Sequence, residues 1–309
     1  MAKPFCELSL FFSTQISEHE ELQSTYIATC VLNSFLCYSA VMLNFVAIYA
    51  IRKTSSVPKA LKTLLLSLTV SDVGVGLLGQ PLHISLLIMW LQQHDPVCNT
   101  YKGSLMVSVL FCIISFFGVV ALSVDRFLAI HLHLRYQELV THKRVVSVVI
   151  LIWVFSVFIS LMIWWVLFDI IRVVIIILGV VAFVVTTVVY IRIYLAVQRL
   201  RKNQIHVLQV QQATENNEIT NLANIVKSTF GIFYVFLLFL FCSLPSFICI
   251  AVFQISGPSI PLKKVFLFSC SLLFLNSSLN PVIYCWKMRQ IRHAVIKKLR
   301  NISWLRNDN

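Results

Sequence analysis

An acid and a base stand side by side in an otherwise apolar stretch of this sequence. Asp125 and Arg126 lie within residues 123–130, and no other charged residue precedes them back to Lys102. A guanidinium among apolar residues must lie at a lipid–water boundary or face a cavity and a partner, because its burial costs several kcal/mol. Asp125 is the nearest partner. The alternative interpretation is an arginine that reaches for the membrane surface beside an incidental aspartate.

A second carboxylate, Asp72, is the only acid well inside an apolar run. Burial of a carboxylate within a membrane span is energetically costly, so we expect Asp72 to have a polar partner or a bound ion. The polar candidates on other apolar runs are Asn44, Ser115, Asn276, Ser277 and Asn280. Together their oxygens would suit a small hard cation such as sodium. The alternative is a neutral Asp72 in a hydrogen-bonded network that serves packing alone.

The composition indicates an integral membrane protein. Of 309 residues, 59% are hydrophobic and only 12% are charged, against roughly 25% charged in soluble domains. The net charge of +13 comes from basic residues spread over short segments between apolar runs. That distribution sets membrane orientation and argues against a nucleic-acid partner.

Seven apolar runs are long enough to cross a bilayer, which takes about 20 residues each. They lie near 27–51, 60–89, 99–130, 145–168, 173–198, 222–255 and 262–286. The predicted fold is therefore all-α, a seven-transmembrane helix bundle over 27–286, after a tail at 1–26. Twenty Lys and Arg residues fall on one side and five on the other. This asymmetry predicts an extracellular N-terminus and a cytosolic C-terminus.

The segment 287–309 is predicted to hold a short amphipathic eighth helix on the inner membrane surface, followed by a cytoplasmic tail. Apolar residues alternate there with Lys and Arg, as in helices that lie in the membrane interface. The apolar residues are Ile291, Ala294, Val295, Ile296 and Leu299, and Trp286 stands just before the segment.

Motifs on all seven runs resemble those of the rhodopsin-like (class A) G-protein-coupled receptors. In order they are Asn44, Asp72, Asp125-Arg126-Phe127, Trp153, Tyr190, Phe239 with Cys242-Ser243-Leu244-Pro245, and Asn276-Ser277 with Asn280-Pro281-Val282-Ile283-Tyr284. The resemblance covers roughly residues 26–300. It is greatest to the group of melanocortin, adenosine, cannabinoid and lysophospholipid receptors.

The resemblance implies a receptor, not an enzyme, that passes an extracellular signal to a heterotrimeric G protein. Arrestin and a receptor kinase would be further partners, and the ligand would be a small molecule, a lipid or a peptide. The implied activation switch comprises Asp125, Arg126, Phe127, Tyr190, Phe239, Ser243, Pro245, Asn280, Pro281 and Tyr284.

The resemblance also implies two binding sites between the helices and no cofactor beyond an allosteric sodium ion. The ligand cavity is predicted to be lined by Ser108, Cys112, Ser243, Ile250 and Cys270. The sodium site is predicted at Asp72, Ser115, Asn276 and Asn280.

Departures from the family pattern argue against the ligands of several relatives. Leu82, Tyr101 and Leu105 stand where melanocortin receptors have acids. Ile250 replaces the adenosine-binding asparagine and Ser108 the aspartate that binds amines, and the seventh run has no mid-membrane lysine for retinal. Melanocortin peptides, adenosine, amines and retinal are all disfavoured.

The restraints on activation depart from the family pattern as well. Ser243 replaces the usual tryptophan of the sixth helix, and Ile225 replaces the acid that holds the helix-three arginine, although Glu218 lies two turns earlier. Weaker restraints lower the barrier to the active state, so we expect some basal signalling.

The cysteines leave one pairing open. Cys98, at the outer start of the third run, pairs in the family with the second outer loop, but that loop holds no cysteine here. Cys6 is the remaining candidate on the outer side. A Cys6–Cys98 disulfide and two free thiols are both compatible with the sequence.

Two other classes of protein fit the sequence less well than a receptor. A non-receptor seven-helix transporter or channel would be expected to carry inverted repeats or several intramembrane charges. A membrane enzyme would need paired acids, a metal cluster or an activated nucleophile, whereas the histidines His83, His94, His131 and His133 are scattered over both sides.

Overall fold

The computed structural model describes residues 16–55, 57–94, 96–132, 135–165, 173, 176–177, 179–181, 183–195, 198, 216–257, 259–288, 291–296 and 300. Of a few of these, including residues 216–228, only the backbone is described. The predicted short turn between the fourth and fifth runs, at residues 168–172, lies outside these ranges.

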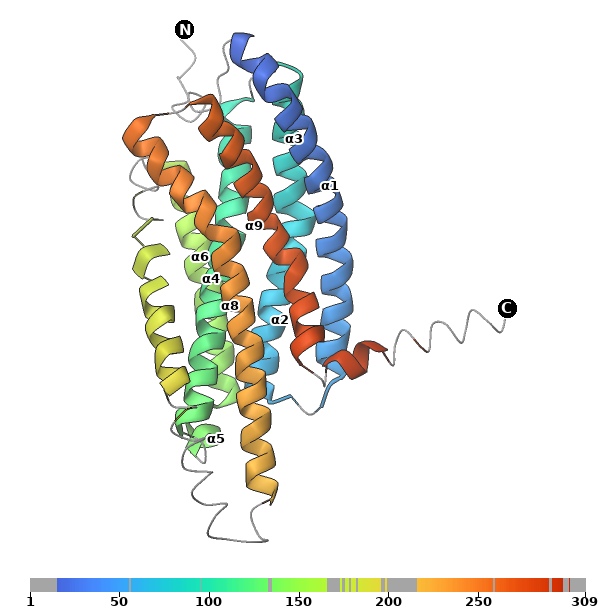
Figure 1. Ribbon diagram of the computed structural model, residues 1–309, viewed down its shortest axis with the longest axis vertical. Helices are drawn as coiled ribbons and strands as arrows, with labels where there is room; N and C mark the ends of the chain where they lie inside the picture. The colour runs from blue at the N-terminus through green and yellow to red at the C-terminus, as the bar shows by residue number, and fades with distance from the viewer. Residues whose placement is uncertain are drawn as a thin grey trace, which may run out of the picture.

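The described part of the chain is a bundle of long helices with no strand. Six of its helices are long and apolar enough to cross a membrane, and a shorter apolar helix, Gly179–Leu195, lies within the predicted fifth run. The predicted all-α bundle is thereby confirmed (Figure 1). In chain order the elements are α1 (Ile16–Lys53), α2 (Lys59–Gly74), the π-helical turn η2 (Val75–Gly79), α3 (Gln80–Leu91), α4 (Cys98–Leu132), α5 (Tyr136–Leu139), α6 (His142–Trp165), α8 (Asn216–Ser256) and α9 (Ile260–Lys287).

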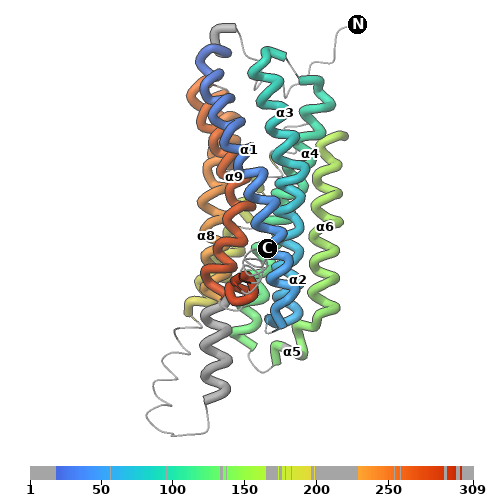
Figure 2. Tube along the Cα trace, turned by 90° about the vertical axis from the view of Figure 1, so that its right-hand side faces the viewer, coloured from blue at the N-terminus to red at the C-terminus, as the bar shows by residue number. Residues whose placement is uncertain are grey.

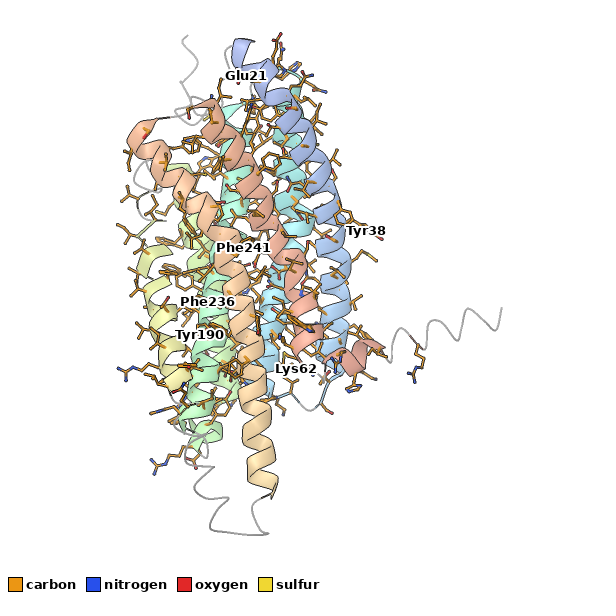
Figure 3. The ribbon with its side chains drawn as sticks, viewed as in Figure 1. Glu21, Tyr38, Lys62, Tyr190, Phe236 and Phe241 are labelled. Atoms are coloured by element: carbon orange, nitrogen blue, oxygen red, sulfur yellow. The ribbon has the colours of Figure 1, made fainter. Side chains whose placement is uncertain are left out.

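The helices pack side by side along the long axis of the molecule. α9 lies between α1 and α8, while α4 contacts α2, α6 and α8. Figure 2 shows α8 and α6 on opposite sides of the bundle. Many large apolar side chains face outward, such as Tyr38 and Phe241, which are 67% and 68% exposed (Figure 3). Outward apolar side chains suit a bundle surrounded by lipid.

The first helix is longer than its hydropathy predicts. It begins at Ile16 and not near residue 27, because its outer turns also have an apolar face. Leu22 and Tyr26 are buried there in a cluster with Trp90 and Leu267. The acidic residues that limit the apolar run therefore do not limit the helix.

The second span is interrupted by the π-helical turn η2. This turn ends at Gly79, immediately before Gln80 and Pro81. The backbone N–H of Gln80 bonds to the carbonyl of Val75, five residues back, and the ring of Pro81 cannot supply the usual donor to the preceding turn. Gly76, inside this turn, lies against α1, where the thiol of Cys37 donates to its carbonyl at 3.0 Å. The backbone next to Pro81 thus forms a wide turn that packs on α1.

A short helix follows α9 over residues 291–296. Ile291 is fully buried in the core at the inner end of the bundle, Ala294 and Val295 pack against that core, and Ile296 is 45% exposed. One face of this short helix, with Ile291, therefore packs on the bundle, whereas Ile296 faces outward. Leu299 lies outside the described residues.

Candidate functional site

The acid–base pair lies buried at the inner end of α4. Asp125 and Arg126 are only 4% and 3% exposed. Arg126 donates from Nε to Oδ2 of Asp125 at 3.0 Å, and its Nη2 pairs with the same oxygen. This buried geometry disagrees with the alternative of an arginine that reaches for the membrane surface. In a desolvated ion pair of this kind, the loss of one partner is costly.

Tyr136 completes this pair, and the sequence analysis missed it. The Tyr136 hydroxyl, on the short α5, donates to the second carboxylate oxygen, Oδ1 of Asp125, at 2.6 Å. Burial raises the pKa of Tyr136, and the charge of the Asp125 carboxylate raises that pKa further, so the hydroxyl stays protonated and keeps donating. The only sequence signal was a tyrosine shortly after the third run, which does not specify a partner.

Tyr190 links the fifth span to α4 and α8. Ser123 on α4 donates to the Tyr190 hydroxyl at 2.9 Å. The Tyr190 ring stacks on Phe236 of α8 with centroids 4.8 Å apart, and Figure 3 labels both residues. Tyr284, the other predicted switch tyrosine, is 1% exposed, and its hydroxyl has no hydrogen-bond partner among the described residues.

The switch residues of α8 and α9 lie where proline frees backbone groups. Pro281 cannot donate to the carbonyl of Ser277, one turn earlier. Asn44 of α1 uses that carbonyl instead, donating at 2.8 Å. In α8, Pro245 likewise frees the carbonyl of Phe241. The hydroxyl of Ser243 nearby donates to a different carbonyl, that of Phe239, at 2.6 Å. The side chains of Glu218 and Ile225 lie outside the described part of α8.

Asp72 is fully buried and held by α9. Asn280 donates from Nδ2 to Oδ2 of Asp72 at 2.9 Å, and Ser277 lies beside the carboxylate. Ser115 approaches Ser71, the neighbour of Asp72, at 3.4 Å. Within the described residues, several buried oxygens lack a hydrogen-bond partner: Oδ1 of Asp72, Asn44, Asn276 and Asn280. Such acceptors need a donor, a water or a cation, so these residues fit a small hard cation.

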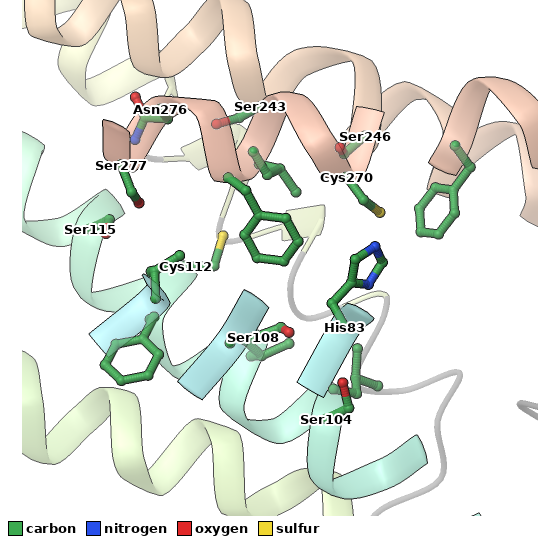
Figure 4. A pocket seen from close by; sticks show the side chains of 18 of the residues that line it. His83, Ser104, Ser108, Cys112, Ser115, Ser243, Ser246, Cys270, Asn276 and Ser277 are labelled. Carbon is green, nitrogen blue, oxygen red and sulfur yellow. The ribbon is translucent and has the colours of Figure 1, made fainter. Parts of the chain in front are cut away.

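A cavity of about 260 Å³ lies between α3, α4, α8 and α9. All five residues predicted for it line it: Ser108, Cys112, Ser243, Ile250 and Cys270. Three residues of the Asp72 region, Ser115, Asn276 and Ser277, also line it, toward one end (Figure 4). Two of the four residues predicted for the sodium site, Ser115 and Asn276, thus lie in the cavity wall, whereas Asp72 and Asn280 do not line the cavity. The ligands of both sites stay a prediction.

Most of the cavity wall was not predicted and is apolar or aromatic. The additional lining residues include Leu86, Trp90, Tyr101, Phe111, Phe247, Phe266, Leu267 and Phe274. His83 and Ser246, neither of which was predicted to line the cavity, add polar atoms to its wall. Both lie in long apolar runs, where a single polar residue is as compatible with packing as with binding.

Cys98 is disulfide-bonded. The other cysteines of the described part are free: Cys30, Cys37, Cys112, Cys242, Cys249, Cys270 and Cys285. Cys6 lies outside the described residues, so the predicted Cys6–Cys98 pairing stays a prediction.

A lipid-facing helix bundle with an internal cavity and a buried acid–base pair at one end defines a multi-pass membrane protein of the receptor type. Residues 43–169 and 163–284 match the family described as 7 transmembrane receptor (rhodopsin family), and the chain belongs to that family. Its predicted resemblance to rhodopsin-like receptors is therefore confirmed.

The chain is similar to several adenosine receptors. Adenosine receptor A2b of Gallus gallus is 31% identical over 140 residues, which cover 45% of this chain and 39% of the relative. Adenosine receptor A2a of Equus caballus is 25% identical over 307 residues, covering 85% and 69%. Adenosine receptor A2b of Homo sapiens is 34% identical over 95 residues, which cover 30% of this chain and 26% of the relative. The aligned region spans well under half the length of both A2b receptors.

Proposed function

We propose that this protein is a plasma-membrane receptor that converts binding of an extracellular ligand into activation of a heterotrimeric G protein. The observation that carries the proposal is the closed Asp125–Arg126 pair, capped by Tyr136, on the helix that also lines the cavity. Cys112 and Asp125 are separated along α4 by about 20 Å, at the usual helical rise. One rigid element thus contacts both the ligand and the switch.

Activation would open this pair. Tyr190 and Phe236 connect α8 to α4 just above it, so an outward movement of the inner end of α8 breaks that contact. Arg126 then turns toward the cytosolic cavity, where its guanidinium donates to the G protein. The ligand acts only through the difference in its affinity for the two states.

Sodium would act as a resident allosteric ion that favours the closed state. Asp72, Ser115, Asn276 and Asn280 would hold it, and the unpaired oxygens of three of these residues support this assignment. The cation supplies positive charge to a buried carboxylate and to amide oxygens that have no other donor. Arrestin and a receptor kinase are further proposed partners on the cytosolic side.

The adenosine receptors among its relatives raise adenosine as a candidate ligand, but we propose a different one. Ile250 lines the cavity at the position of the adenosine-binding asparagine and offers no hydrogen bond. Without the asparagine, the cavity lacks the hydrogen bond that would select adenosine over less polar ligands.

Second-messenger output, normalised to surface receptor, tests the proposal. Asp125→Asn should free Arg126 and raise basal output several-fold. Arg126→Ala should abolish coupling while ligand affinity changes by no more than a few-fold, since the arginine lies far from the cavity. Unchanged normalised output in both variants would falsify the assignment of the pair as a signalling switch.

A further inference from the structure

The cavity is built for an uncharged ligand. Among the described residues that line it there is no Asp, Glu, Lys or Arg. The nearest buried carboxylate, Asp72, does not line it and already accepts a hydrogen bond from Asn280. A charged ligand would lose its hydration on entering and find no opposite charge, which is strongly unfavourable in a low-dielectric site.

Two unpaired polar atoms at one end of the cavity wall are left for a ligand, while a third, Oδ1 of Asn276, lies at the other end beside the proposed sodium site. Nε2 of His83 and Oγ of Ser246 are buried and have no hydrogen-bond partner within the described residues. Ser246 is only 3% exposed. Figure 4 shows both side chains toward the same end of the cavity, away from Ser115 and Asn276. A hydroxyl can donate and accept, and a neutral imidazole nitrogen does one or the other according to its tautomer.

Two other serines of the wall, Ser243 and Ser115, are less available. Ser243 donates to the carbonyl of Phe239 at 2.6 Å, and Ser115 lies 3.4 Å from Ser71. At the end of the cavity away from Asn276, the buried polar atoms without a partner among the described residues are those of His83 and Ser246. Buried polar atoms that stay unpaired are costly, so a ligand that pairs with them gains affinity.

The remaining wall selects apolar surface and a small size. The His83 ring packs on Phe274 with centroids 5.2 Å apart, and Trp90, Phe111 and Phe266 also line the space. The volume of about 260 Å³ is close to the lower end of ligand pockets, roughly 300–1,000 Å³. A large or branched molecule would not fit without movement of the helices.

We propose that the cavity binds a small, uncharged, oxygenated hydrocarbon whose hydroxyl or carbonyl group bonds to His83 and Ser246. Its apolar body lies against the aromatic wall. This inference deepens the proposed receptor function and rests on it for the signalling consequence, whereas binding itself is independent of the G protein.

Matched probes on one skeleton test the charge and the oxygen separately. The purified full-length protein in lipid nanodiscs is titrated with farnesol, farnesoic acid, farnesylamine and farnesene, and binding is read from the shift in thermal unfolding. Geraniol, geranic acid and geranylamine repeat the comparison on a shorter chain. The alcohol of at least one skeleton should bind at least tenfold more tightly than its acid and its amine.

Two variants locate the binding group. His83→Phe and Ser246→Ala should each weaken alcohol binding by about 2- to 10-fold, the range for one neutral hydrogen bond, and leave farnesene binding unchanged. Ser156→Ala is the matched control, since Ser156 is a buried serine on α6 whose hydroxyl bonds to the carbonyl of Ile152. It should leave binding of every probe unchanged.

Several results would overturn the inference. They are an acid or amine that binds as tightly as its alcohol, failure of both alcohols to shift unfolding, or equal loss of alcohol and farnesene binding in the two variants. A G-protein reporter is read separately. A charged probe that binds and signals refutes the ligand class alone, whereas an alcohol that binds while the Asp125 and Arg126 variants signal normally refutes the proposed function alone.

Discussion

At the scale of single residues, the inner switch depends on three groups that satisfy one another. Arg126 occupies one oxygen of Asp125, and Tyr136 occupies the other. Each is buried or half-buried, so removal of any one leaves a desolvated polar atom behind. The expected basal signalling depends on how firmly these contacts hold, because Ile225 stands where the family has the acid that holds Arg126.

Tyr136→Phe tests the part of the tyrosine. The variant removes the donor to Oδ1 of Asp125 and keeps the ring, which costs about 1–3 kcal/mol for a buried unsatisfied acceptor. We expect raised basal second-messenger output, by less than in Asp125→Asn, because the ion pair survives. Tyr38→Phe is the control, since that tyrosine is 67% exposed on α1. Basal output equal to that of the wild type would assign Tyr136 to packing alone.

Asp72→Asn tests the cation site. A cation that binds only the closed state shifts the equilibrium by its differential affinity. Replacing the carboxylate removes the charge that would hold the ion, so agonist affinity and basal output should no longer respond to sodium. The measurement compares sodium with an organic cation at equal ionic strength. A wild-type receptor that ignores sodium would leave Asp72 as a packing group only.

At the scale of elements, the second span depends on a close approach between η2 and α1. A Cβ added to Gly76 would lie 2.7 Å from Val41 Cγ2 and 3.3 Å from the Cys37 carbonyl. Part of that contact is with backbone, which cannot rotate away. The wide turn before Pro81 therefore requires a glycine at this contact.

Gly76→Ala should lower stability by about 1–3 kcal/mol, the usual cost of overpacking. Gly103→Ala on α4 is a matched control, because a Cβ there has no neighbour within 4 Å. Alanine also favours a helix over glycine by roughly 0.5–1 kcal/mol, so the control should be neutral or slightly stabilising. Thermal unfolding of the two purified variants decides, and equal melting temperatures would contradict the packing argument.

At the scale of the whole molecule, charge and hydropathy set how the bundle lies in the membrane. The cavity and the Asp125–Arg126 pair lie toward opposite ends of α4. Twenty of the twenty-five Lys and Arg residues fall on the side of the pair. A receptor needs the pair on the cytosolic side and the cavity toward the outside, and the charge asymmetry predicts this orientation.

Epitope tags test the orientation directly. An N-terminal tag should be stained on intact cells, and a C-terminal tag only after permeabilisation. A tag of equal length on a cytosolic protein controls for leaky cells. Reversed staining would remove the receptor function altogether, since the switch would then face away from G proteins.

The sequence by itself predicted the spans and their orientation, because these follow from hydropathy and charge along the chain, and it pointed to the charged pair of the proposed switch. It also determined the five cavity residues, through the family resemblance. Only the tertiary structure placed the Tyr136 hydroxyl on Asp125, the Asn44 amide on the Ser277 carbonyl and the unpaired atoms of His83 and Ser246 in the cavity wall. Each of these depends on the rotation and depth of one helix relative to another. The spacing of residues within a single helix does not fix its rotation or its depth, because packing between helices decides both.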